Sequence, residues 1–294
     1  MKIKIYSVTL YLLTFAIISS CSNSSEKDSI DKDVIDPASS LNTNFDGKIF
    51  SIPSPVQTAM FIKALNLPYD NNVLNPIENS SNYSTEFKQA LNLGIYGTDL
   101  GYCSLYEQKN NSLKYLSIVE KLTRQLGLEG AFDKTFMSRF EKNSSNQDSM
   151  LVITADAYRK ADYFLKNAKR KSTSSLILAG GWIESMHFAC KMYGTTKNSK
   201  IKERIGEQQQ TLTTMIEILD EFNKSKQNDE LISSLNDLKI EFDKIIIDYK
   251  YVAPKTDAKN KVTTLQHEIK VEISENVMSA ISTKVNNLRE SVIK

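Results

Sequence analysis

The sequence predicts an all-α fold, a single domain of about seven to nine mostly antiparallel helices over residues 48–294, arranged as a helical bundle or an array of helical hairpins. Three observations support this. One long segment is apolar on nearly every side, several others are apolar on one face only, and most segments are joined by short polar loops. No repeat of fixed length is present.

The segment that is apolar all round is 174–193, in which only Glu184 and Lys191 are charged. A helix of this kind belongs at the centre of a fold. Its uninterrupted apolar run, 176–183, is far shorter than the ~20 residues that cross a bilayer. Gly180 and Gly181 lie in its interior, where each glycine costs ~1 kcal/mol relative to alanine. We therefore expect a second helix to pack closely against this pair.

The second helix is predicted over 85–108. It carries small residues at spacings of four, three and four, which places them on one face: Ala90, Gly94, Gly97 and Gly101. Such a face allows another helix backbone to approach closely. We expect the partner to be the Gly180–Gly181 helix.

The first residues have the pattern of an export signal. Lys2 and Lys4 precede an apolar core at 5–18, and Ile18-Ser19-Ser20-Cys21 resembles the lipobox of bacterial lipoproteins. That resemblance implies removal of residues 1–20 as a signal peptide and acylation of Cys21. Two or more acyl chains would anchor the protein stably in a lipid bilayer. The alternative is an ordinary secretory signal with a chance cysteine.

Residues 21–47 are rich in Ser, Asp and Asn and predict a disordered tether behind the lipidated cysteine. The residue after the cysteine is Ser22 and not aspartate, and in this the sequence resembles lipoproteins exported to the outer membrane of Gram-negative bacteria. The acids Glu26, Asp28 and Asp31 resemble surface-export signals, although a plain linker explains them equally well. We expect an outer membrane lipoprotein of the bacterial cell envelope, on the periplasmic face or the cell surface.

Charge excludes one class of partner. Without Lys2 and Lys4 the 37 basic residues become 35, which equals the 35 acidic residues. A neutral chain has no overall field that attracts nucleic acid, so no nucleic-acid partner is expected.

Periodicity and capping residues place the remaining elements in chain order. The predicted helices cover about 55–66, 85–108, 112–127, 131–142, 147–170, 174–193, 198–223, 229–249 and 275–292. A long loop at 67–83 is expected to be functional or mobile. A second loop is predicted at 254–261. The stretch 262–273 is ambiguous, because 269–273 alternates like a strand. Cys103 and Cys190 could pair, but two separate buried thiols are favoured.

No motif reaches the standard of a catalytic signature, and neither a cofactor nor a metal is predicted. Glu184 and His187 form one Glu-x-x-His pair, whereas di-iron proteins use two such pairs. Glu184 is expected to have a partner, such as Arg159, a tyrosine hydroxyl or a helix N-terminus. An internal ion pair is favoured over a ligand site. If the face that carries Gly180, Glu184, His187 and Lys191 is open, it is the place for a ligand. The candidate residues for such a groove are Tyr96, Asp99, Trp182, Glu184 and His187.

Trp182 and the thirteen tyrosines could stack on sugars, although packing in the core is favoured.

Three segments resemble a group of helical lipoproteins of Bacteroidetes-type bacteria. They are Ile52-Pro53-Ser54-Pro55, the run 90–102, and Leu178-Ala179-Gly180-Gly181-Trp182-Ile183-Glu184. The resemblance spans about 48–294 and implies an exported, all-helical lipoprotein without adding catalytic residues.

The expected function is that of a binding or scaffold protein. Its expected partners are the bilayer, through Cys21, and an envelope protein or glycan. The alternative is an exported hydrolase or metal-dependent enzyme that uses Glu184, His187 and Asp99. A deep polar pocket joining these three residues would favour the enzyme, and their burial in an ion pair would favour the scaffold.

Overall fold

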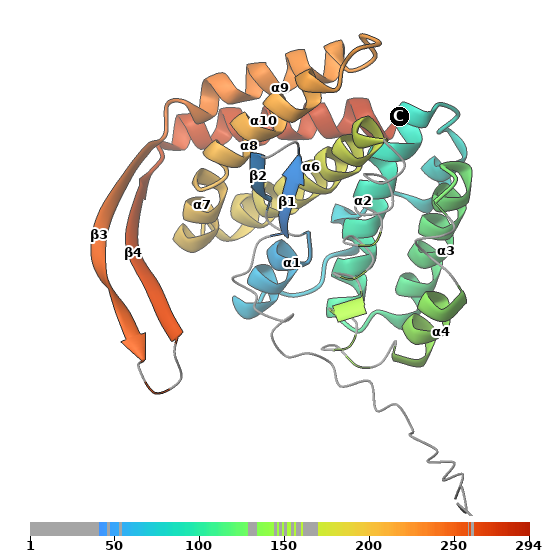
Figure 1. The fold of residues 1–294 in the computed structure, drawn as a ribbon, viewed down its shortest axis with the longest axis horizontal. Coiled ribbons are helices and arrows are strands. Elements are labelled where there is room, and N and C mark those ends of the chain that lie inside the picture. The colour runs from blue at the N-terminus through green and yellow to red at the C-terminus, as the bar shows by residue number, and fades with distance from the viewer. Residues whose placement is uncertain are drawn as a thin grey trace, which may run out of the picture.

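The computed structural model confirms the predicted fold class, because the chain is mostly helical (Figure 1). It describes residues 41–45, 48–52, 55–128, 134–143, 170–257, 259 and 262–294, together with single positions at 146, 149, 152, 153, 156 and 160. Residues 1–40, with the predicted signal and Cys21, lie outside the described residues. So does most of the helix predicted at 147–170.

The described part of the chain contains nine α-helices: α1 (Pro55–Ala64), α2 (Glu86–Leu105), α3 (Lys109–Gln125), α4 (Lys134–Asn143), α6 (Lys171–Thr196), α7 (Ser199–Gly206), α8 (Gln209–Glu221), α9 (Asp229–Phe242) and α10 (Glu275–Ile293). Two 3₁₀ turns, η2 (Asn71–Val73) and η3 (Ile77–Ser81), precede α2. Four strands form two antiparallel hairpins, β1 (Leu41–Phe45) with β2 (Lys48–Ile52) and β3 (Ile246–Asp257) with β4 (Val262–Glu272). Side chains cap three of the described helices, as expected for N-cap residues: Thr85 at α2, Asn198 at α7 and Ser274 at α10.

The apolar segment is the central helix, as predicted. Helix α6 contacts α1, α2, α7, α8 and α10, and its residues from 173 to 190 are buried without exception. Its closest neighbour is α2. A Cβ added at Gly180 would overlap the Leu91 carbonyl, and one added at Gly94 would lie 2.6 Å from the Gly181 nitrogen. The two helix backbones therefore touch where the sequence predicted.

We expect Gly180→Ala to destabilise the protein by about 3 kcal/mol or more, because the new methyl group forces α2 and α6 apart. A Cβ added at Gly194, in the same helix, would meet no other atom within 4 Å, so Gly194→Ala should instead be neutral or stabilising by up to about 1 kcal/mol. Chemical denaturation of both variants checks this. Equal effects of the two substitutions would contradict the close crossing.

Three predictions about element boundaries were wrong. The helix predicted at 198–223 is two helices, since Gly206 ends α7 against the Val271 and Ile273 side chains. The helix predicted at 229–249 ends at Phe242, because the β-branched and aromatic residues beyond it favour a strand. That strand, β3, also contains part of the loop predicted after Pro254. The alternation at 269–273 does belong to a strand, β4.

The tether was predicted to be disordered as far as residue 47. Its residues 41–45 instead form β1, which pairs with β2.

The loop at 67–83 is fastened to the body by tyrosine hydroxyl groups. Tyr106, Tyr115 and Tyr96 donate to the backbone oxygens of Leu67 (2.8 Å), Asn75 (2.9 Å) and Pro76 (2.7 Å). The Asp70 N–H donates to the Tyr102 hydroxyl at 3.0 Å. These bonds satisfy backbone groups that a buried loop would otherwise leave unpaired. The tyrosines of α2 and α3 thus serve packing and loop attachment.

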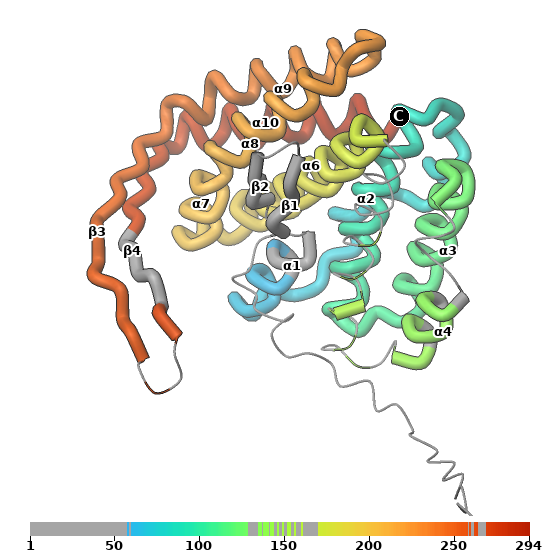
Figure 2. Tube along the Cα trace, in the orientation of Figure 1, coloured from blue at the N-terminus to red at the C-terminus, as the bar shows by residue number. Residues whose placement is uncertain are grey.

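Hairpin β3–β4 is the one described element that extends away from the helices. It connects the end of α9 to the start of α10, which pack side by side (Figures 1 and 2). Beside its base lies a groove of about 540 Å³ that is lined by residues of α7, β3 and β4.

Candidate functional site

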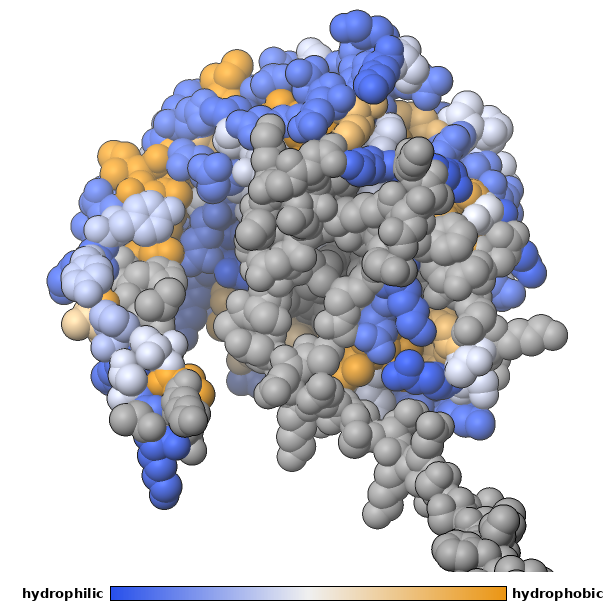
Figure 3. Space-filling model, viewed as in Figure 1, coloured by the Kyte–Doolittle hydropathy of each residue, from blue (hydrophilic) through white to orange (hydrophobic). Residues whose placement is uncertain are grey.

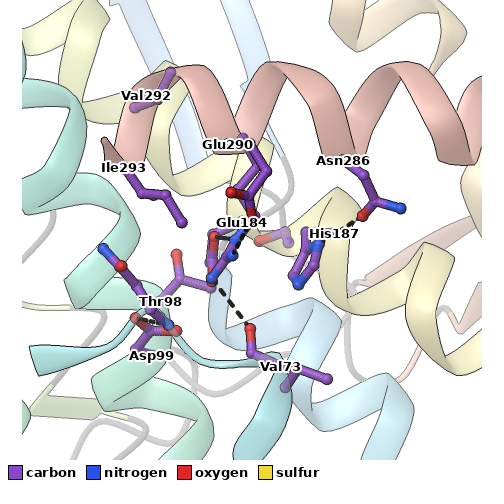
Figure 4. A network of polar contacts seen from close by, with 12 residues as sticks. Val73, Thr98, Asp99, Glu184, His187, Asn286, Glu290, Val292 and Ile293 are labelled. Carbon is purple, nitrogen blue, oxygen red and sulfur yellow. Dashed lines mark hydrogen bonds and ion pairs between the residues drawn. The ribbon is translucent and has the colours of Figure 1, made fainter. Parts of the chain in front are cut away.

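A buried ion pair links the central helix to the last helix of the chain (Figure 4). The Arg289 guanidinium, on α10, donates from Nε to Glu184 Oε2 at 2.6 Å and from Nη2 to Glu184 Oε1 at 2.7 Å. The Glu184 side chain is 0% exposed and that of Arg289 is 5% exposed. This two-point geometry is the strongest form of carboxylate–guanidinium contact. The partner of Glu184 is therefore Arg289, while Arg159, one of the predicted partners, lies outside the described residues.

Arg289 also binds the loop in front of α2. Its Nη2 donates to the Val73 carbonyl oxygen at 3.2 Å, and its Nη1 lies 4.0 Å from Glu290 Oε1. Arg289 therefore joins α6, α10 and η2. Burial by itself lowers the pKa of Arg289, but the Glu184 charge and its hydrogen bonds outweigh burial, and the net shift is upward. The guanidinium stays charged.

Asp99, on α2, completes the cluster as a second buried carboxyl group. Its Oδ2 accepts a hydrogen bond from the Asn75 N–H at 3.3 Å, while its Oδ1 is buried without a partner of its own. Burial, and then the neighbouring Glu184, raise the pKa of Asp99 well above its usual value. Burial also raises the pKa of Glu184, whereas Arg289 and a hydrogen bond from Asp99 act to lower it.

One proton shared between the two carboxyl groups accounts for these facts. Arg289 contacts Glu184 directly, so Glu184 is the ionised member, and Asp99 keeps its proton and donates it toward Glu184. The proton then lies on Asp99 Oδ1, the oxygen without a partner, which acts as a hydrogen-bond donor. With this assignment the cluster contains one positive and one negative charge.

His187 lies one helical turn from Glu184 and is neutral. Its Nδ1 is 2.9 Å from Asn286 Oδ1 on α10, and the side chain is buried. Burial, with the nearby charge of Arg289, lowers the pKa of His187 to about 3. His187 is thus a second polar link between α6 and α10.

All five predicted groove residues lie in the interior, with exposed fractions between 0% and 5%: Tyr96, Asp99, Trp182, Glu184 and His187. Asp99 and Glu184 meet in one cluster with His187 beside it. Tyr96 instead binds the loop, and Trp182 donates to Gln208 Oε1 at 3.2 Å. Surface grooves of about 540, 380 and 130 Å³ lie elsewhere and are lined by none of the five. The face from Gly180 to His187 is closed, and only Lys191 at its end is exposed.

The Glu-x-x-His pair is not arranged for a metal. Glu184 is bound by Arg289 and His187 by Asn286, and no group of three or more His, Cys, Asp or Glu side chains that could hold an ion occurs among the described residues. Cys103 and Cys190 are separate buried thiols, as favoured, and burial raises the pKa of each to about 12.

Sequence reasoning missed Arg289 and Asn75. Arg289 lies four residues after Val285 and three before Val292, on the apolar face of α10. A charged residue at such a position is the signal that it must have a buried partner.

Comparison with known proteins found no matching family model, no similar curated protein and no similar solved structure. Over the part of the chain that the structure describes, no helix combines the length and the apolar character needed to span a bilayer.

Glu184→Gln should destabilise the protein, whereas Asp99→Asn should not. Glu184→Gln leaves the Arg289 charge buried without its counter-ion, and we expect a loss of about 3 to 5 kcal/mol in the free energy of unfolding. Asp99→Asn keeps a donor toward Glu184 and an acceptor for Asn75, so we expect no loss at pH 7. Urea denaturation measures both. A large loss in Asp99→Asn would show that Asp99 is ionised.

The stability difference between Asp99→Asn and the wild type should depend on pH. The pKa of Asp99 is raised on folding. The contribution of its protonated form to the free energy of unfolding is therefore complete below the unfolded-state pKa of about 4, and it is lost as the pH rises toward the folded-state pKa. Above pH 4, the free energy of unfolding of the variant should therefore increase relative to that of the wild type by up to about 1.4 kcal/mol per pH unit. Unfolding curves at several pH values test this. A stability difference that does not change with pH would contradict a protonated Asp99. The titration of His187 cancels in this difference, because both proteins contain that residue.

Proposed function

We propose that the protein is an outer-membrane-anchored lipoprotein that acts as a binding or scaffold protein, with an envelope protein or glycan as its partner. The observation that carries this proposal is the burial of Glu184 in its ion pair with Arg289. Glu184, His187 and Asp99 are the residues that an enzyme would need, and each is bound by neighbouring elements and hidden from water.

The interior supports this function through rigidity. A general acid or base must reach a substrate, whereas the Glu184 cluster, over the described part of the chain, is held between α2, α6, α10 and the loop at 67–83. The cluster fixes how the last helix sits on the central one. A rigid body then presents its outer surface, and the long hairpin that projects from it, to other molecules.

The anchor in this proposal is Cys21, on the strength of the lipobox-like Ile18-Ser19-Ser20-Cys21. A scaffold held at a membrane meets its partner at a high local concentration, so modest contacts suffice for binding. The neutral charge of the chain after the signal suits a protein partner or a glycan better than a nucleic acid.

Cells that express the wild type or Cys21→Ala, grown with radiolabelled palmitate, test the anchor. We expect the label and membrane retention in the wild type, and neither in Cys21→Ala. Cys190→Ala is the matched control and should keep both, because Cys190 is a buried thiol within α6. Label on the Cys21→Ala protein would refute the anchor.

Cross-linking of the same cells, followed by affinity purification of the wild-type chain and mass spectrometry, tests the binding role. A specific envelope protein or glycan that is recovered with the wild type and depleted with Cys21→Ala is the expected result. A chain that is labelled and retained in the membrane but recovers no partner would refute the scaffold function while leaving the anchor in place.

A further inference from the structure

Hairpin β3–β4 is a two-stranded ribbon that stands apart from the helical core over most of its length (Figure 1). A ribbon of two strands is marginally stable in water. Its large side chains are also exposed, with Tyr249 at 70% and Tyr251 at 82%. The space-filling view shows hydrophobic surface where the hairpin leaves the body and a hydrophilic tip (Figure 3). Such a ribbon gains stability when another strand pairs with it.

The two faces of the ribbon differ in chemistry. Alternation along β3 places Ile247, Tyr249 and Tyr251 on one face, and the register adds Val271 and Ile269 of β4 opposite the first two. The other face carries the charged pair Asp248 and Lys250 between Ile246 and Val252, with Lys270 opposite Asp248. The apolar face is partly covered near its base, where Ile247 and Val271 pack against the core.

The outer edge of the ribbon is β3. Strand β4 lies against α7, where the Gly206 backbone leaves room for the Val271 side chain. Strand β3 pairs only with β4 among the described strands. Its regular pairing covers residues 246–252, since the register shifts between Val252 and Lys255. Unpaired backbone groups along such an edge are a template for another strand.

The regular segment reads Ile-Ile-Asp-Tyr-Lys-Tyr-Val and is self-complementary about its midpoint, Tyr249. If a second copy pairs antiparallel about Tyr249, Asp248 of each copy lies opposite Lys250 of the other. The same register places Ile247 opposite Tyr251, so the apolar face continues across the pair. A shift of one residue would mix the two faces. A two-fold axis at Asp248 or at Lys250 would place like charges opposite each other.

From this charge complementarity we infer that the protein forms a homodimer in which the β3 edges of two copies pair antiparallel about Tyr249, giving a four-stranded sheet. The inference goes beyond the proposed function, because the pairing requires neither the lipid on Cys21 nor the envelope partner. In the dimer, Tyr249 and Tyr251 of both copies form one apolar surface.

Sedimentation of the full chain in detergent, over a range of protein concentrations, tests this with charge reversals. Asp248→Lys places two Lys–Lys pairs at the interface, and Lys250→Asp places two Asp–Asp pairs there. Each should weaken dimerisation by at least about tenfold. The double reversal Asp248→Lys/Lys250→Asp should restore the dimer, and so should an equal mixture of the two single variants.

Lys255→Asp is the control, because it applies the same chemistry beyond the regular segment and should leave the dimer unchanged. Circular dichroism verifies that every variant keeps its helices. A wild type that is monomeric at all concentrations overturns the inference. So does a dimer that survives Asp248→Lys, or one that the double reversal fails to restore.

Discussion

The buried ion pair between Arg289 and Glu184 is the constraint on which the rest of the interior depends. It connects residues 105 positions apart in the chain and closes α10 onto α6. Removing two charges from water is costly, so the pair persists only because both Glu184 oxygens are bound and because Arg289 has the Val73 carbonyl as a further acceptor. It also dictates the state of Asp99, since a second ionised carboxylate beside Glu184 would leave a buried negative charge without a counter-ion.

The close crossing of α2 and α6 makes this arrangement possible. Gly94 and Gly180 let the two backbones touch, which brings Asp99 on α2 within hydrogen-bonding reach of Glu184 on α6. The tyrosines of α2 and α3 then hold the loop whose Val73 and Asn75 complete the cluster. The buried polar residues of the cluster and the tyrosines thus hold the helices and the loop at 67–83 together. In the proposed function, recognition falls to the outer surface and to the hairpin.

Much of the fold could be predicted because it depends on local patterns. The apolar helix and the glycine pair reveal a close helix crossing from the sequence, since only a neighbouring backbone offsets the cost of two interior glycines. The candidate cluster was predicted in part. Glu184 was expected to have a buried partner, but pairing with Arg289 depends on how the last helix returns to the core, which no local pattern encodes. Hairpin β3–β4 was largely missed because its first residues continue the apolar spacing of α9, and only tertiary context separates the two.

Hydrogen–deuterium exchange of the Arg289→Met variant against the wild type tests most directly whether the ion pair fastens α10 to the core. Methionine retains much of the apolar length of arginine and removes the charge. We expect faster exchange of the α10 amides and of those near Val73, with α4 unchanged because it lies away from α10 (Figure 1). If α10 in Arg289→Met exchanges at the wild-type rate, the ion pair does not hold the fold together as described.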